Sequence, residues 1–183
     1  NAIKKLGLLP KISETEKIAI TSGNVWIDAP LFSGKPNFKW IYSQKYPELT
    51  QEEQAFLDIE TEQLCAMCVD YDVQVERDLP AEVWQFLREK KFFGMIIPKE
   101  HGGLGFSAYA HSAVIQKLSS RSVPLAITAM VPNSLGPAEL LLHYGTKKQQ
   151  EYYLPRLADG RELPCFALTE STAGSDATSI ISN

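Results

Sequence analysis

Apolar residues recur at close to the helical period along residues 51–71, with polar residues between them. Thr50 and Glu53 stand at the start of this stretch in the pattern of a capping box, in which each side chain bonds a backbone N–H group of the other residue. The pattern therefore predicts a helix from residue 51 with one face towards a core. The residues expected on that face are Phe56, Ile59, Leu64, Met67 and Tyr71.

Further helices are predicted by their start and stop signals. Pro80 suits the first turn of a helix that Gly94 can end, and Ser107 is a candidate cap for a helix over residues 108–118. The apolar stretch over residues 125–144 is expected to be helical but broken near its two prolines. A second capping box precedes a helix that runs to about residue 158. The two prolines are Pro132 and Pro137, and the second capping box consists of Thr146 and Gln149.

The pattern changes on both sides of this helical region. Residues 1–49 are rich in proline and glycine but carry scattered aromatic residues, which indicates an extended arm that packs on a neighbour rather than a loose linker. Residues 163–169 are a short apolar run suited to a strand, and residues 172–176 have the composition of a tight turn. We expect a mainly α chain with an arm over 1–49, a helical domain over 50–160 and the start of a β domain over 161–183.

Composition narrows the class of protein. Hydrophobic residues make up 44% and charged residues 22%, as in ordinary globular proteins, and the net charge of -4 argues against a nucleic-acid partner. Three cysteines are too few for a disulfide scaffold and favour a reducing, cytoplasmic setting. An uninterrupted apolar stretch of the roughly 18 residues that a membrane span needs is not expected in this sequence. The first residue is not methionine, so we treat the chain as a fragment.

Residues 173–176, Ala-Gly-Ser-Asp, are a candidate ligand-binding turn. Small residues let the backbone approach a flat or phosphorylated ligand, and successive N–H groups can hold anionic oxygens. Thr169 and Ser175 add hydroxyl groups that can donate to a ring carbonyl or a phosphate. The same composition is common in plain β-turns, so the pattern alone leaves both interpretations open.

Four motifs resemble those of the acyl-CoA dehydrogenases. The stretch FALTESTAGSD over 166–176 resembles the family's first signature, and IPKEHGGLG over 97–105 resembles its glycine-rich loop. NSLG over 133–136 and YGTKKQ over 144–149 stand in the family's order. The match spans roughly residues 51–180, and the arm resembles that of the longer bacterial members that serve fatty-acid β-oxidation. The chain is therefore identified as a member of this family.

The resemblance implies a three-part fold and a flavin-dependent reaction. N-terminal helices would be followed by a central β-barrel, of which this chain holds the first strand and loop, and by a C-terminal four-helix bundle. FAD would accept a hydride while a glutamate of the C-terminal part removes a proton, converting fatty acyl-CoA to trans-2-enoyl-CoA. No catalytic residue is then expected within residues 1–183, and this stretch alone is expected to be inactive.

The resemblance also assigns binding residues and partners. The backbone at Phe166 and Leu168 and the hydroxyl of Thr169 would face the pyrimidine edge of the flavin. Gly174 and Ser175 would lie by the FAD pyrophosphate, and Ser175 also by acyl-CoA. Electron-transfer flavoprotein is the implied electron acceptor, and a homo-oligomer with cytoplasmic or inner-membrane-associated location is implied for the complete enzyme. The residues expected to flank the acyl-tail cavity are Thr128, Val131 and Leu135.

Departures from the family pattern and two rival functions stay open. Ser171 replaces the usual proline, Thr172 stands where glycine or glutamate is frequent, and His101 replaces tyrosine, which changes the expected loop geometry. An acyl-CoA oxidase shares the fold but passes electrons to oxygen. A non-catalytic helical module used for assembly is the rival from another class.

The cysteine and histidine residues do not predict a metal site. Cys65 and Cys68 have the spacing of a redox or zinc pair, but zinc needs four ligands and the pair falls within a predicted helix. We interpret them as two small residues that pack on one helical face. The three histidines, His101, His111 and His143, lack metal-ligand spacing.

Overall fold

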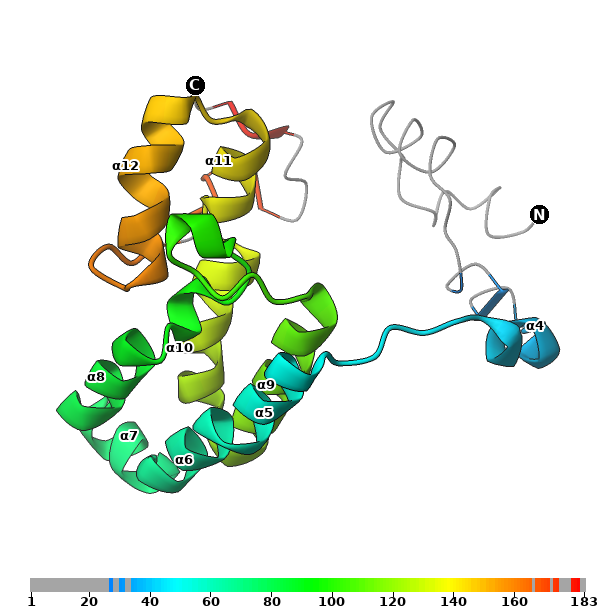
Figure 1. The fold of residues 1–183 in the computed structure, drawn as a ribbon, viewed down its shortest axis with the longest axis horizontal. Helices are drawn as coiled ribbons and strands as arrows, with labels where there is room; N and C mark the ends of the chain where they lie inside the picture. Colours follow the sequence, from blue (N-terminus) through cyan, green and yellow to red (C-terminus); the bar gives the residue numbers. More distant parts are fainter. Residues whose placement is uncertain are drawn as a thin grey trace. The chain divides into compact units, whose positions relative to one another are not determined.

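The computed structural model describes residues 27, 30, 31, 34–165, 167–171, 173, 174 and 179–181. Helices dominate this part of the chain, which divides into two units. Residues 47–167 form one unit, and residues 1–46 with residues 168–183 form the other. In the second unit the structure describes one short helix, α4 (Phe38–Ser43). The helices that concern function belong to residues 47–167 (Figure 1).

The first predicted helix is interrupted twice. It consists of α5 (Gln51–Asp58), α6 (Glu60–Met67) and α7 (Asp70–Glu76), with extended backbone at Cys68 and Val69. The capping box at its start is confirmed. Phe56 and Leu64 are buried as expected, whereas Ile59 and Tyr71 are 61% and 75% exposed. Their placement on the apolar face was wrong because the helix is interrupted at Ile59 and again at Cys68 and Val69, before Tyr71.

The remaining start signals are confirmed. The chain continues through α8 (Ala81–Glu89), the short 3-10 helices η1 (Phe92–Gly94) and η2 (Lys99–His101), and α9 (Ala108–Arg121). It then forms α10 (Val123–Ser134), α11 (Ala138–Tyr144) and α12 (Lys147–Ala158). Ser107 caps α9, and Thr146 and Gln149 form the capping box of α12. The predicted break near Pro132 and Pro137 lies between α10 and α11.

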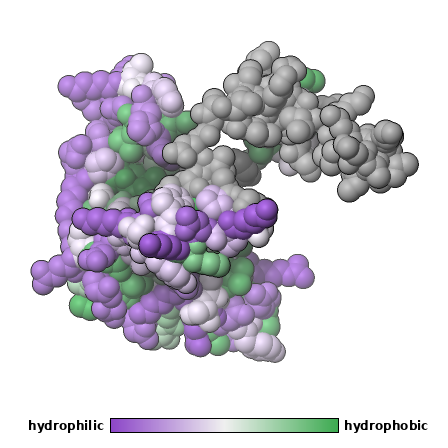
Figure 2. Space-filling view, turned by 90° about the vertical axis from the view of Figure 1, so that its right-hand side faces the viewer, coloured by the Kyte–Doolittle hydropathy of each residue, from purple (hydrophilic) through white to green (hydrophobic). Residues whose placement is uncertain are grey.

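Helix α10 runs through the middle of this unit. In Figure 1 the hairpin of α11 and α12 lies beyond one end of α10, and α5 to α9 gather around the other. The main core is formed by residues of helices α5 to α10 and of η1, and a smaller one is formed by Ile97 with residues of α11 and α12. Figure 2 shows mostly hydrophilic residues on one face of the unit, with apolar residues between them. The largest fully buried side chains include Phe92, Phe93, Leu87, Met95, Leu118, Leu125 and Leu154.

The stretch from Val123 to Tyr144 meets the length and apolarity of a membrane span, contrary to the expectation from sequence. It has 22 residues and a mean hydropathy of 1.3, and it comprises α10 and α11. One such stretch is weak evidence for a span, because a helix from a protein core meets the same criterion. Here α10 packs against α9 and η1 and buries Leu125, Ala126 and Ala129.

The expected strand over residues 163–169 is not formed in the described part of the chain. Residues 163–165 and 167–170 have no regular secondary structure. A strand exists only when its backbone groups pair with a second strand. No such partner lies among the residues that the structure describes, so an apolar run was not sufficient to produce a strand here.

Candidate functional site

The three residues expected beside the acyl tail lie on one side of α10. Thr128, Val131 and Leu135 are separated by three and four residues, which places them one above another on a helix. None of the three belongs to the buried face of α10, and Leu135 is 43% exposed. The same exposed side carries Ile127, which is 49% exposed. The helix therefore has a packed face and a more exposed side, on which Thr128 and Val131 are half-buried and Leu135 is exposed.

A separate cavity lies at each end of this side of α10. At the Thr128 end, a cavity of about 300 Å³ lies between α10, α8 and the turn after α7. At the Leu135 end, a cavity of about 560 Å³ lies against α11. Val131 lines neither, so the structure aligns the three residues without joining them in one cavity. The first cavity is also lined by Val73, Gln74, Arg77, Asp78, Leu79, Trp84 and Pro124, and the second by Ser134, Gly136, Glu139, Leu140, His143 and Tyr144.

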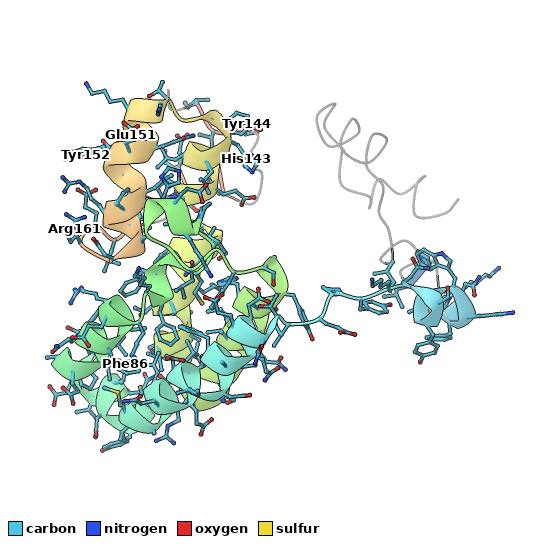
Figure 3. The ribbon with its side chains drawn as sticks, viewed as in Figure 1. Phe86, His143, Tyr144, Glu151, Tyr152 and Arg161 are labelled. Atoms are coloured by element: carbon cyan, nitrogen blue, oxygen red, sulfur yellow. The ribbon has the colours of Figure 1, made fainter. Side chains whose placement is uncertain are left out.

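The cavity at the Leu135 end has a polar wall. Glu139, His143 and Tyr144 belong to α11, and Figure 3 shows His143 and Tyr144 at the end of that helix, apart from Tyr152 on α12. Glu139 is exposed, which fits its interpretation as a residue other than the catalytic base. The hydroxyl of Thr128 at the other end donates to the Pro124 carbonyl at 2.9 Å and is thereby satisfied within the helix. Polar and charged residues also line the cavity at this end, among them Gln74, Arg77 and Asp78.

Asn133 of the NSLG motif ties α10 to the segment that precedes the glycine-rich loop. Its Nδ2 donates to the Phe92 carbonyl at 2.7 Å and to the Ala129 carbonyl at 2.8 Å, and its Oδ1 accepts from the Ile96 N–H at 3.2 Å. The side chain is buried, and both its amide nitrogen and its amide oxygen have hydrogen-bond partners. This structural role was missed from the sequence. An asparagine inside an apolar helical stretch was the available signal, because such a group needs buried partners.

The glycine-rich loop is built from short backbone contacts. Leu104 N–H donates to Gly94 O at 3.0 Å and Phe106 N–H to Met95 O at 2.8 Å, which folds the loop back on itself. Gly102 has φ of +86°, and a Cβ on Gly103 would lie 2.1 Å from the Ile97 carbonyl oxygen. The glycines therefore serve the packing of this loop beneath Asn133, and the described contacts do not make the loop a phosphate cradle.

Among the expected flavin residues, the structure describes Leu168, Thr169 and Gly174, whereas Phe166 and Ser175 lie outside the described residues. The turn that follows Thr169 is closed by two backbone hydrogen bonds, from Glu170 N–H to Ala173 O at 2.9 Å and from Ala173 N–H to Glu170 O at 3.3 Å. The described part of the predicted turn thus begins at Glu170, before Ala173. The Glu170 carboxylate also accepts a hydrogen bond from the Ile181 N–H at 3.1 Å.

The residues before this turn suit the edge of a flavin. Leu168 and Thr169 are exposed, and neither their N–H groups nor the Thr169 hydroxyl have a hydrogen-bond partner among the described residues. Gly174 has no atom within 4 Å of where a Cβ would be, so its surroundings are open. Unpaired donors beside an open backbone are the groups that a ring carbonyl or a phosphate oxygen needs. The described residues therefore fit FAD in their chemistry.

His111 on α9 is a histidine whose imidazole pKa is shifted by burial. Its Nε2 is buried without a hydrogen-bond partner in the described residues, and burial lowers the pKa of its imidazole from the usual 6.5. The charged or titratable residues that line the adjoining hollow are Glu139 and His143. No group of three or more His, Cys, Asp or Glu residues that could hold a metal ion occurs in the described part of the chain.

The cysteine pair has the features of packing residues. Cys68 is fully buried, and Cys65 is partly buried with its thiol 3.9 Å from the Lys117 carbonyl. Burial raises the pKa of both thiols, although Arg121 lies nearby and donates to both cysteine carbonyls. A raised pKa suppresses the reactive thiolate, so the structure favours the packing interpretation.

Comparison with known proteins places this helical unit in a family. The model of the acyl-CoA dehydrogenase N-terminal domain matches residues 50–161. The human very long-chain specific acyl-CoA dehydrogenase, mitochondrial, is 34% identical over 140 residues, which is 74% of this chain and 21% of that protein. The 3-(aryl)acrylate reductase of Clostridium sporogenes is 36% identical over 109 residues, which is 60% of this chain and 29% of that protein. The helical unit found here is thus an acyl-CoA dehydrogenase N-terminal domain.

The chain belongs to the acyl-CoA dehydrogenase family and corresponds to its N-terminal region. It spans 15% to 24% of the length of the first curated relatives that it matches. A solved structure of the electron transferring flavoprotein of Acidaminococcus fermentans matches 74% of this chain and 36% of its own with a TM-score of 0.60. At 24% identity this likeness supports the fold alone.

Proposed function

We propose that this chain is the N-terminal part of an FAD-dependent enzyme that converts fatty acyl-CoA to trans-2-enoyl-CoA, the first step of β-oxidation. The observation that carries the proposal is the family match over residues 50–161, followed directly by the TESTAGSD stretch over 169–176. When bound, FAD supplies the hydride acceptor, while the protein supplies alignment and electrostatics. The exposed, unpaired groups at Leu168 and Thr169 would bind the ring, and the more exposed side of α10 would hold the acyl tail.

The proton acceptor is proposed to come from another part of the enzyme. Removing a proton beside a thioester requires a carboxylate whose pKa is raised in a dry pocket and hydrogen bonds that stabilise the enolate. The acidic residues that line the two cavities beside α10, Asp78 and Glu139, are both exposed rather than held in a dry pocket. This agrees with the glutamate base that the family resemblance places on a C-terminal domain, and with the proposal that residues 1–183 alone are inactive.

The direct test is anaerobic titration of the natural, FAD-loaded protein with a fatty acyl-CoA. Loss of the oxidised flavin absorbance and formation of the enoyl-CoA product would support the proposal. Absence of flavin reduction with acyl-CoA would contradict it. Rapid peroxide formation in air would instead identify the oxidase that shares this fold, whereas electron transfer to an added electron-transfer flavoprotein would support that protein as the acceptor.

Removal of the Thr169 hydroxyl should slow flavin reduction. If that hydroxyl donates to the flavin ring, the bond strengthens as negative charge grows on the ring in the transition state. Thr169→Val keeps the shape of the side chain, and losing such a charge-assisted bond costs about 1.5–3 kcal/mol, or roughly ten- to a hundredfold in rate. Stopped-flow flavin reduction at saturating acyl-CoA measures the effect in the natural protein.

Ser175→Ala supplies the contrast to Thr169→Val. The expected partners of Ser175 are phosphate or acyl-CoA groups whose charge stays constant during the reaction. This variant should weaken FAD retention or acyl-CoA affinity more than the chemical step. Unchanged flavin reduction and unchanged cofactor content in both variants would show that this segment does not line the flavin site.

A polypeptide of residues 1–183 should not retain FAD by itself. It carries one edge of the proposed flavin site, and a cofactor of this size is held mainly by enclosure between surfaces. The measurement is the visible spectrum after the polypeptide has been mixed with FAD and freed of excess by gel filtration. A retained flavin chromophore near one per chain would contradict this expectation.

The complete enzyme is further proposed to be a homo-oligomer in the cytoplasm or at the inner membrane. The support is the likeness of the 1–49 arm to the longer bacterial members of the family. Cross-linking and size measurement of the natural protein, together with fractionation of cells, test both points. Recovery of a monomer from the soluble and membrane fractions would contradict the oligomer.

A further inference from the structure

The segment over residues 29–47 differs from the rest of the chain in charge and in aromatic content. It contains three lysines and no acidic residue, although the whole chain has a net charge of -4. It also contains five aromatic residues. The lysines are Lys35, Lys39 and Lys45, and the aromatic residues are Phe32, Phe38, Trp40, Tyr42 and Tyr46. We call residues 29–47 the basic aromatic segment of an otherwise acidic chain.

Helix α4 within this segment is held by hydrogen bonds from neighbouring residues. The Asn37 Oδ1 accepts from the Trp40 N–H at 3.0 Å, and the Gln44 Nε2 donates to the Trp40 carbonyl at 3.0 Å. The Tyr46 hydroxyl donates to the Ile41 carbonyl at 3.0 Å and fixes the chain after the helix. No residue of α4 is buried. The helix therefore forms through its own caps and leaves its side chains accessible.

Two aromatic rings of α4 face solvent together. Phe38 and Tyr42 are one helical turn apart, are 55% and 80% exposed, and stack with their ring centroids 6.2 Å apart. Lys39 within the helix and Lys45 after it are exposed as well. Aromatic rings favour the boundary between headgroups and hydrocarbon, and lysine side chains reach from there to anionic lipid phosphates. This combination of groups matches the chemistry of an anionic membrane surface.

We infer that the basic aromatic segment binds the surface of an anionic membrane through α4. The rings of Phe38 and Tyr42 lie at the headgroup boundary. The ammonium groups of Lys39 and Lys45 lie on lipid phosphates. With six residues, α4 is much shorter than the roughly 20 that a spanning helix needs, so it lies in the interface.

The charge distribution confines this contact to the segment. Anionic lipids attract the lysines of residues 29–47, whereas the rest of the chain carries more acidic than basic residues and is repelled. The contact gives the proposed inner-membrane location a binding surface. It goes beyond the proposed reaction and does not depend on it.

Quenching of Trp40 by brominated lipids tests the contact in the natural, FAD-loaded protein. Bromine on the acyl chains quenches indoles at the headgroup boundary, and the quenching that disappears in Trp40→Phe reports this one indole, whatever the rest of the protein does. It should occur with vesicles of phosphatidylcholine and phosphatidylglycerol and be absent with phosphatidylcholine alone. Equal quenching of the unaltered protein and Trp40→Phe on the anionic vesicles would overturn the inference, and so would equal Trp40 quenching on both kinds of vesicle.

The double variant Lys39→Gln, Lys45→Gln tests the role of charge. It should raise the vesicle concentration for half-maximal Trp40 quenching about 25-fold, because each lysine at an anionic surface is worth about fivefold in affinity. The matched control is Lys147→Gln with Lys148→Gln, which removes the same charge from exposed positions of α12. The control should leave the quenching unchanged, and an equal loss in both double variants would reject α4 as the contact surface.

Phe38→Ser with Tyr42→Ser tests the role of the rings. It should weaken Trp40 quenching about tenfold or more, because both rings lose their apolar contact with lipid. FAD content and melting temperature are compared for all variants, and Trp40→Tyr replaces Trp40→Phe if that variant is unstable. Unchanged quenching in the folded serine variant would overturn the inference. Flavin reduction by acyl-CoA is measured in parallel, so that failure of the proposed reaction is detected separately.

Discussion

Asn133→Leu should lower the free energy of unfolding of the 183-residue chain by about 3 kcal/mol. The amide makes three hydrogen bonds, two of which join α10 to Phe92 and Ile96 in the segment before the glycine-rich loop. Leucine has a similar size but leaves the Phe92 carbonyl buried without that donor. Leaving a buried polar group unpaired costs about 1–3 kcal/mol, and here more than one group loses its partner. Urea unfolding followed by circular dichroism measures the change.

Ser134→Ala is the control for this substitution. Ser134 is the next residue, is exposed, and donates only to the Met130 carbonyl of its own helix at 3.0 Å. Its loss should change the unfolding free energy by no more than about 0.5 kcal/mol. A cost below about 1 kcal/mol for Asn133→Leu would show that the asparagine does not hold the loop to α10.

The parts of the fold that were predictable are those determined by neighbouring residues. The capping residues Thr50, Ser107 and Thr146 were recognised because a cap needs only the next turn of backbone. The interruptions at Ile59 and at Cys68 were missed because the spacing of apolar residues continues across them. The expected strand over residues 163–169 depended on a distant partner, which no local pattern supplies.

In the candidate site, too, only the features that depend on neighbouring residues could be predicted. Thr128, Val131 and Leu135 were chosen by resemblance to the family, and their spacing places them on one side of a helix. Sequence could not show that the turn near Asp78, some fifty residues earlier, encloses a cavity against Thr128. Nor could it show that Asn133 bonds Ile96, because that contact joins residues 37 positions apart. Such features arise from tertiary packing.

Glu53→Gln should cost about 3 kcal/mol of stability at pH 7. The carboxylate is 5% exposed and joins the starts of two helices. One oxygen accepts from the Thr50 N–H at 2.8 Å and the Thr50 hydroxyl at 2.9 Å, and the other accepts from the Ser107 N–H at 2.7 Å. Burial alone would raise the pKa of Glu53, but the hydrogen bonds from Ser107 and Thr50 lower it to about 2. The difference from the usual 4.5 corresponds to about 3 kcal/mol.

Glu52→Gln is the matched control. Glu52 precedes Glu53 on α5, but it is exposed and pairs with the exposed Lys99 at 2.6 Å. Exposed ion pairs contribute about 0–1 kcal/mol, so this variant should remain close to the unaltered chain. The two substitutions make the same chemical change at adjacent positions, and only one of them removes hydrogen bonds that hold the helix starts together. Equal effects of both variants would contradict the assigned role of Glu53.

The pH dependence separates Glu53 from the other acid-sensitive group. Because its folded pKa is depressed, the contribution of Glu53 is fully present above about pH 4.5 and is lost as pH falls towards 2. The stability difference between the unaltered chain and Glu53→Gln should therefore be constant from pH 7 to 5 and shrink below 4.5. His111, whose burial lowers its pKa, favours the neutral form, so its contribution decreases once pH falls below about 6.5. That earlier loss occurs equally in both proteins and cancels in their difference. A difference that stays constant down to pH 3 would show that the ionised Glu53 carboxylate does not stabilise the fold.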